Sequence, residues 1–206
     1  MVTGLFFDQT MGQVVPTHIA RNSDGKSDGK SLAEMTGADF AQFAYSCAFE
    51  ALGERDDILV IMSCGQRGPM AILDGMSAPL PSNFFAFDIV PQLEVLPLCS
   101  AFITHGGMGS VMESLLHHVP VVVIPVFGDQ INNADRAHAA CLGVGFRYPL
   151  RTLSAQALRD AVLEMVDERS DNPFLLAIDV AMSRMERTGG PGKAVDLILQ
   201  AANGEH

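Results

Sequence analysis

A glycine-rich segment with a histidine, Thr104-His-Gly-Gly-Met-Gly-Ser110, contains residue types that could bind an anion. The glycines Gly106, Gly107 and Gly109 would let the backbone approach an anion closely, because no Cβ atom stands in the way. His105 could donate a hydrogen bond to an oxygen of the same ligand. The segment follows a predicted strand, where the N-terminus of the next helix presents unpaired N–H groups and a partial positive charge. We therefore expect this segment to accommodate a pyrophosphate.

Two other interpretations fit the same residues. Ser110 and Glu113 have the spacing of a capping box, in which serine and glutamate satisfy the N–H groups at a helix start. Gly107 and Gly109 also follow a strand, and Asp129 lies 20 residues beyond Gly109, as in an NAD(P)-binding oxidoreductase domain. That match is weak, because a methionine occupies the position of the third glycine. Local spacing alone leaves these alternatives open.

Two more polar segments follow predicted strands. The carboxylate of Asp129 and the carboxamide of Gln130 could accept from and donate to adjacent sugar hydroxyls, although Asp129 could instead cap the next helix. After Ile89, the exposed backbone at Val90 could contact the edge of a base, with Gln92 on the turn that follows. Taken alone, this second segment is equally typical of a helix that starts with a proline in its first turn.

These segments lie in a region where predicted strands and helices alternate, which implies a parallel α/β sheet of Rossmann-like type with helices on both faces. The predicted strands are Ile58–Met62, Phe84–Phe87, Ala101–Thr104, Pro120–Ile124 and Val144–Arg147. The predicted helices are Ala38–Leu52, Pro91–Leu96, Gly109–Leu116 and Asp129–Cys141, then one that Ser154 caps and that runs to Val166, one that starts at Pro173, and a terminal helix after a break at Gly189–Gly192.

The length of 206 residues predicts a single domain. Residues 1–37 form a divergent lead-in, in which Val14–Ala20 could be the first strand and Arg21–Ser31 an exposed polar loop. Residues 38–206 form the ligand-binding domain, with helices over residues 154–203.

Composition narrows the classes of function. The chain carries 24 acidic and 13 basic residues, a net charge of −11, so nucleic acid and anionic membranes are poor partners. Only Arg136 and Arg147 are basic between residues 81 and 150, so N–H groups, a hydroxyl and an imidazole would have to hold the anion there. The longest apolar run, Val119–Phe127, has nine residues and two prolines, whereas a membrane-spanning helix needs roughly 20, so we expect no transmembrane segment.

The four cysteines are widely spaced and form no C-x-x-C pair, which predicts reduced, buried thiols and neither a metal site nor a disulfide. The first eight residues lack a basic leader. Together these features predict a cytoplasmic chain.

Read together, the motifs resemble the donor-binding signature of the UDP-glycosyltransferase superfamily, most closely that of macrolide and antibiotic glycosyltransferases. The resemblance is specific over residues 83–145 and is carried by Val90–Leu96, Phe102–Ser110, Glu113, Val119–Pro120 and Pro125–Ala134. It implies the C-terminal half of a two-domain GT-B fold. Such a half binds a UDP-sugar or dTDP-sugar without a metal or other cofactor, for inverting transfer of a hexose to an acceptor hydroxyl.

The resemblance also implies roles for single residues, in which His105 stabilises the leaving group and is not the base. Two departures are notable: Ile89 stands where many relatives stack a tryptophan on the base, and His117-His118 stands where relatives have a glycine. We expect these two histidines to be exposed and not to bind metal. The implied contacts are to base and ribose by Ile89, Val90, Gln92 and Glu113, to pyrophosphate by His105, Gly106, Gly107, Gly109 and Ser110, and to the transferred sugar by Asp129 and Gln130.

In the family that it resembles, a separate N-terminal domain binds the acceptor and supplies the catalytic base. This chain has about the length of one half, so we expect it to be inactive alone. Three hypotheses follow: a subunit that works with a separate acceptor-binding subunit, a fragment of a longer glycosyltransferase that lacks its N-terminal domain, and a non-catalytic nucleotide-sugar-binding module or remnant. The expected small molecules are a nucleotide-sugar donor and an acceptor.

Overall fold

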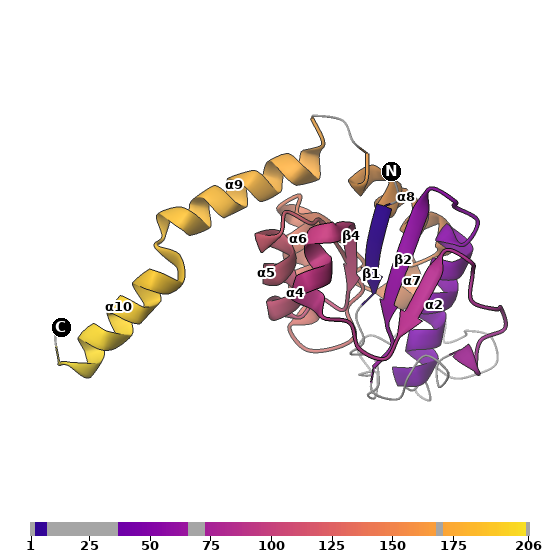
Figure 1. Cartoon of the computed structure of the whole chain (residues 1–206), viewed down its shortest axis with the longest axis horizontal. Helices are drawn as coiled ribbons and strands as arrows, with labels where there is room; N and C mark the ends of the chain where they lie inside the picture. Colours follow the sequence, from indigo (N-terminus) through magenta and orange to yellow (C-terminus); the bar gives the residue numbers. More distant parts are fainter. Residues whose placement is uncertain (1–2, 8–36, 66–72, 168–170, 205–206) are drawn as a thin grey trace.

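The computed structural model describes residues 3–7, 37–65, 73–167 and 171–204. Within these residues one six-stranded sheet has the order β3-β2-β1-β4-β5-β6, and every neighbouring pair is parallel (Figure 1). The predicted parallel sheet is thereby confirmed. The strands are β1 (Thr3–Phe7), β2 (Ile58–Ser63), β3 (Phe84–Phe87), β4 (Cys99–Thr104), β5 (Val121–Val123) and β6 (Gly143–Gly145).

The strand β1 lies in the middle of the sheet, between β2 and β4. Leu5 pairs with Val60 on one side, and Phe6 pairs with Phe102 on the other. The sequence instead favours Val14–Ala20 as the first strand, and that segment and the polar loop after it lie outside the described residues. Only three of the five residues of β1, Leu5, Phe6 and Phe7, are large and apolar, which is too weak a local signal for a strand. Its pairing with β2 and β4 is what makes it a strand.

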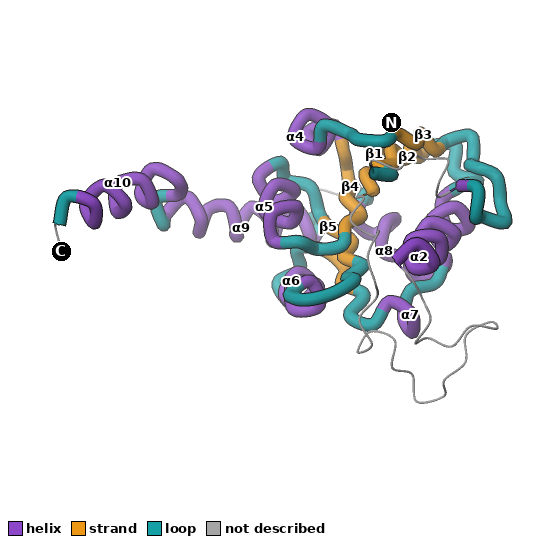
Figure 2. Tube along the Cα trace, turned by 90° about the horizontal axis from the view of Figure 1, so that it is seen from below, coloured by secondary structure: helices purple, strands orange, loops and turns teal. Residues whose placement is uncertain are grey.

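Helices cover both faces of the sheet, as the alternation predicts. Figure 2 shows α4, α5 and α6 on one side of the strands and α2, α7 and α8 on the other. Most ends lie within a few residues of the predicted ones. The helices are α2 (Gly37–Leu52), α4 (Gln92–Val95) with a 3-10 turn at Leu96–Leu98, α5 (Met108–Leu116), α6 (Gln130–Ala139), α7 (Pro149–Thr152), α8 (Ala155–Met165), α9 (Pro173–Arg187) and α10 (Gly190–Ala202).

Two apolar layers hold these helices on the sheet. On the α2 and α8 side, Phe40 and Leu52 of α2 pack in one cluster with Leu158 of α8, all completely buried. On the other side, Val121 and Val123 of β5 and Ala134 of α6 are buried around Phe102 of β4. Burying a side chain of this size contributes about 1.5–3 kcal/mol.

The last two helices form an arm that extends away from the sheet (Figure 1). Ile178 of α9 packs against Val111 and Leu115 of α5, which anchors the start of the arm. The predicted break falls at Gly189, which has a left-handed φ of 90°, whereas Gly190–Gly192 already belong to α10. In α10 the apolar side chains Val195, Leu197, Ile198 and Leu199 are each more than half exposed. Among the described residues, no helix has the length and apolar character that a membrane crossing requires.

Candidate functional site

The residues predicted to bind the ligand lie on three loops, and on the helices that follow these loops, at the carboxyl ends of the strands. Because all strands are parallel, their carboxyl ends meet at one edge of the sheet, and β1 runs downward from the N mark in Figure 1. Ile89 and Val90 follow β3, His105 follows β4, and Asp129 follows β5. Ligands of open parallel sheets bind at such an edge.

The helices that follow the first two loops, α4 and α5, are joined by a hydrogen bond between side chains. The amide Nε2 of Gln92 donates to Oε2 of Glu113 at 2.6 Å, although the two residues lie 21 positions apart. The contact is possible because the chain crosses from the edge strand β3 to α4, which lies on the same side of the sheet as α5 (Figure 2). A bond from an amide to a carboxylate is short and orients the carboxylate.

This contact also corrects the capping-box interpretation. The helix α5 begins at Met108 with Gly107 at the N-cap, so Ser110 already lies inside its first turn. The side chain of Glu113 bonds to Gln92 instead of reaching back to the helix start. The glycine-rich loop lets the helix begin earlier than the Ser-x-x-Glu spacing indicates, because glycine needs no side-chain space at the turn.

The loop between β4 and α5 passes very close to β5. Gly106 has a left-handed φ of 84°, and a Cβ atom on it would come within 2.3 Å of Val123 Cγ1. Its N–H group donates to Oγ1 of Thr104 at 3.2 Å. The packing at this point therefore favours glycine.

The imidazole of His105 lies against the start of α5. A Cβ atom on Gly107 would come within 2.6 Å of Nε2 of His105, so the ring stands beside this N-cap residue. His105 itself is 9% exposed. A Cβ atom on Gly109 would meet nothing within 4 Å, so there is open space beside the first turn. The first N–H groups of a helix have no acceptor within the helix, so an imidazole and N–H groups are grouped beside free space.

The third loop holds the carboxylate and carboxamide predicted to contact a sugar. Asp129 is exposed and occupies the N-cap position of α6, but its side chain makes no capping hydrogen bond, so the capping alternative is wrong. Gln130 is 4% exposed, and its Oε1 accepts from the N–H groups of Val126 and Phe127 at 2.9 and 3.0 Å. Both lone pairs of that oxygen are used, so a contact of Gln130 with a sugar would come from its amide nitrogen.

One buried residue at this edge has no assigned role in the sequence prediction. The Nδ2 atom of Asn133 donates to the carbonyl oxygen of Gly106 at 2.9 Å and to Oδ2 of Asp129 at 3.2 Å. The bond to Asp129 follows from their separation of four residues, which brings side chains together on a helix. The bond to Gly106 spans 27 positions and depends on the fold.

A comparison with protein families identifies the chain. The family model described as UDP-glucoronosyl and UDP-glucosyl transferase matches residues 75–178, half of the chain. The chain belongs to this family. The matched range includes all the residues that the sequence assigns to the binding site of a UDP-glycosyltransferase.

Curated UDP-glycosyltransferases match part of the chain. An uncharacterized UDP-glucosyltransferase of Bacillus subtilis, YojK, is 38% identical over 142 residues, which make up 69% of this chain and 33% of that protein. The oleandomycin glycosyltransferase of Streptomyces antibioticus is 34% identical over 119 residues, 58% of this chain and 26% of that protein. The chain thus spans between a quarter and a third of the length of the curated relatives it matches.

Solved glycosyltransferase structures share the fold of nearly the whole chain. The glycotransferase of kitacinnamycin matches with a TM-score of 0.69 at 24% identity, covering 96% of this chain and 43% of that one. The Os79 protein of O. sativa, solved in complex with UDP, matches with a TM-score of 0.68 at 15% identity, covering 99% of this chain and 41% of that one. These structures confirm the expected GT-B half as the fold of this UDP-glycosyltransferase chain.

The two adjacent histidines, which depart from the family pattern, lie at the end of α5 away from the candidate site. His118 is exposed, and its Nδ1 lies 3.0 Å from Oδ1 of Asp179, so it links α5 to α9. His117 is half-buried at the C-cap. The four cysteines are free; Cys47 and Cys64 are buried, and the other two are half-buried.

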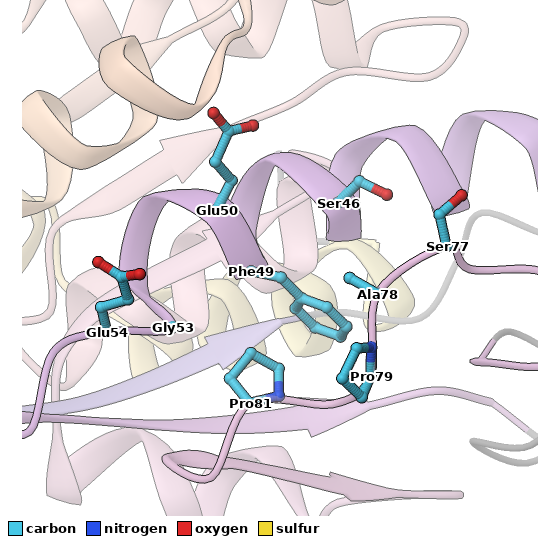
Figure 3. Close-up of a pocket in the computed structure, with 9 residues that line it drawn as sticks. All are labelled: Ser46, Phe49, Glu50, Gly53, Glu54, Ser77, Ala78, Pro79 and Pro81. Carbon is cyan, nitrogen blue, oxygen red and sulfur yellow. The ribbon is translucent and has the colours of Figure 1, made fainter.

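A pocket of about 600 Å³ lies at the other edge of the sheet. It is lined by the end of α2, with Phe49, Glu50 and Glu54, and by the loop that leads to β3, with Pro79 and Pro81 (Figure 3). Since α2 ends just before β2 and Pro81 just precedes β3, the pocket adjoins the amino ends of these strands. It is therefore separate from the candidate site.

Proposed function

We propose that this chain is the nucleotide-sugar-binding part of a glycosyltransferase and binds a UDP-sugar or a dTDP-sugar at the carboxyl edge of its sheet. The observation that carries the proposal is the position of the His105 imidazole beside the start of α5, next to the open space at Gly109. The pyrophosphate would bind there, held by the first N–H groups of α5, the hydroxyl of Ser110 and the imidazole. These groups suit an anion in a region that has few basic residues.

The base and the ribose would lie over the first loop and Glu113. The Gln92 amide holds one oxygen of the Glu113 carboxylate, which leaves the other oxygen to accept from ribose hydroxyls. A ribose offers two adjacent hydroxyls and a deoxyribose one, so this carboxylate favours UDP over dTDP. The main chain at Val90 would contact the base, while Ile89, 60% exposed, would cover it less fully than an aromatic ring.

The transferred sugar would contact Asp129, and the reaction would proceed by direct displacement at its anomeric carbon. An acceptor hydroxyl forms the new bond as the bond to the nucleoside diphosphate breaks, and the hydroxyl proton passes to a base. The negative charge that develops on the leaving diphosphate would be stabilised by His105 and by the N-terminus of α5. We place the base in an acceptor-binding part outside this chain.

Two exposed apolar areas support the association with such a part. At the site edge, each of the three loops carries a large exposed apolar residue: Ile89, Met108 and Phe127 are 60%, 44% and 39% exposed. On the arm, α10 exposes an apolar surface of its own. Exposed apolar groups gathered in this way mark protein interaction sites. A longer chain or a separate subunit would supply the acceptor-binding part, and a cytoplasmic location stays a prediction.

Calorimetric titration of the 206-residue chain with UDP, dTDP and NAD tests the proposal. We expect UDP to bind most tightly, and His105→Ala to weaken its binding at least tenfold, about 1.4 kcal/mol. His138→Ala, on the exposed side of α6, is the matched control and should leave binding unchanged. Binding of NAD in preference to UDP would favour an oxidoreductase domain. A folded chain that binds none of the three would favour a remnant whose site has decayed, or a site that forms only with the acceptor-binding part.

A further inference from the structure

We propose that Asn133 is a positioning residue that couples the pyrophosphate loop to the carboxylate that holds the sugar. This inference rests on the proposed function, since it assigns Asp129 to the sugar and the loop at Gly106 to the pyrophosphate. One buried amide nitrogen contacts both loops, with Gly106 O at 2.9 Å and Asp129 Oδ2 at 3.2 Å. Asn133 is 4% exposed, so water does not compete freely for these bonds.

The geometry gives each N–H of the Asn133 amide one acceptor. A carboxamide nitrogen carries two hydrogens, and here one acceptor lies on the loop after β4 and the other on the loop after β5. Movement of either loop relative to the other breaks one of the two bonds. Asn133 therefore fixes the distance between the place of the pyrophosphate and the carboxylate of Asp129.

The second loop is fixed along its length as well. Gln130 accepts from the N–H groups of Val126 and Phe127, so one residue of α6 holds the loop backbone while Asn133 holds the carboxylate. With Oδ2 of Asp129 bonded to Asn133, its other oxygen remains to accept from a sugar hydroxyl. A carboxylate oriented in this way needs no rearrangement when the sugar binds. This raises the affinity for a UDP-sugar and leaves the affinity for UDP, which has no such sugar, unchanged.

The consequence is a specific effect on the sugar. In Asn133→Ala, Asp129 loses its orienting partner, so we expect affinity for UDP-glucose to fall about tenfold and affinity for UDP to fall less than threefold. The adjacent Asn132, of the same type but exposed on α6, provides the matched control, and Asn132→Ala should change neither affinity. Asn133→Leu, which keeps nearly the size of the side chain and removes both N–H groups without adding a charge beside Asp129, replaces Asn133→Ala if the alanine variant does not fold.

A double-mutant cycle with Asp129→Ala completes the test. Calorimetry with UDP and with UDP-glucose is applied to the wild type, both single variants and the double variant, with thermal unfolding measured for each. If Asn133 acts through Asp129, its substitution no longer changes the ratio of the affinities for UDP-glucose and UDP once Asp129 is alanine. A lower unfolding temperature with equal losses for UDP and UDP-glucose would show a merely structural role and overturn the inference. So would an unchanged affinity of Asp129→Ala for UDP-glucose, because Asn133 would then have no sugar contact to position.

The outcomes for the two proposals differ. If the wild type binds neither UDP nor UDP-glucose, the proposed function fails and the inference fails with it. If the wild type binds both, and Asn133→Ala keeps the same ratio of the two affinities, the proposed function stands and the inference about Asn133 is wrong.

Discussion

The contact between Gly107 and His105 makes a sharp prediction about Gly107→Ala. An alanine Cβ would lie 2.6 Å from Nε2 and 3.3 Å from Cε1 of the imidazole, too close for atoms that are not bonded. The backbone at Gly107 has φ −58° and ψ 140°, which alanine adopts without strain. The ring therefore has to move while the backbone stays in place. We expect His105 to leave the position from which it would contact the pyrophosphate.

We expect Gly107→Ala to lower the affinity for UDP much more than it lowers the stability of the fold. A hydrogen bond to a charged group contributes about 1.5–3 kcal/mol, so loss of the imidazole contact should weaken UDP binding roughly ten- to a hundredfold. Replacing glycine by alanine at an N-cap costs folding no more than about 1 kcal/mol. The folded fraction at room temperature should thus stay close to that of the wild type.

The assay is calorimetric titration with UDP of the wild type, Gly107→Ala, His105→Ala and the double variant. Both substitutions remove the same contact, so the double variant should bind no worse than the weaker single variant. Gly192→Ala in α10, where a Cβ atom would meet nothing within 4 Å, controls for the added methyl group and should bind normally. If Gly107→Ala weakens binding by the same factor with and without the His105 ring, displacement of the imidazole is not the cause and the reasoning is refuted.

Three further predictions concern stability, recognition of the ribose and pH. Asn172 is 1% exposed and bonds the end of α8 to the start of α9, so Asn172→Ala should lower the unfolding free energy in urea by about 1–3 kcal/mol and leave UDP affinity unchanged. Glu113→Ala should weaken UDP more than dTDP in calorimetry, because dTDP lacks the 2′-hydroxyl, and equal losses would contradict the ribose assignment. Burial raises the pKa of the thiols of Cys47, Cys64 and Cys99 from 9.0 to about 11. The unfolded chain therefore loses these protons first, so the stability that these three thiols contribute is fully present below about pH 9 and is lost between about pH 9 and 11. A urea midpoint at pH 10.5 that equals the midpoint just below pH 9 would contradict this.

Much of the fold follows from local signals in the sequence. Ser154 begins α8 as predicted, and its hydroxyl accepts from the N–H of Ala157 at 3.1 Å. Pro173 begins α9, and the helical spacing of apolar residues gives α2 almost to its ends. These signals act within one or two turns, so they are readable without knowledge of the fold. The strand β1 could not be predicted in this way, because it forms a strand only by pairing with partners more than fifty positions away in the sequence.

The candidate site also has features that the sequence predicts and features that only the structure shows. The residue types and their place after strands are visible in the sequence, because a parallel sheet brings the carboxyl ends of its strands to one edge. The directions of the side chains are not visible. Gln130 turns back onto its own loop, Glu113 meets Gln92 across two elements, and the bond from Asn133 to Gly106 forms only once α6 packs beside β4. Only the i, i+4 spacing of Asp129 and Asn133 could have indicated the last residue.

The hydrogen bonds of Gln92 and Asn133 suggest how a chain with an excess of acidic residues could bind an anionic ligand. Two carboxylates assigned to the ligand, Glu113 in α5 and Asp129 at the N-cap of α6, are each held by a neutral side-chain amide, from Gln92 and Asn133 respectively. A lysine or arginine partner would compete with sugar hydroxyls for the carboxylate oxygens, whereas an amide nitrogen occupies one oxygen and leaves the other to accept. The pyrophosphate would meet the positive end of α5 and the imidazole, away from these oriented acceptors. The separation of hydroxyl acceptors from N–H groups along one edge is thus what a ligand with two sugars joined by a diphosphate requires.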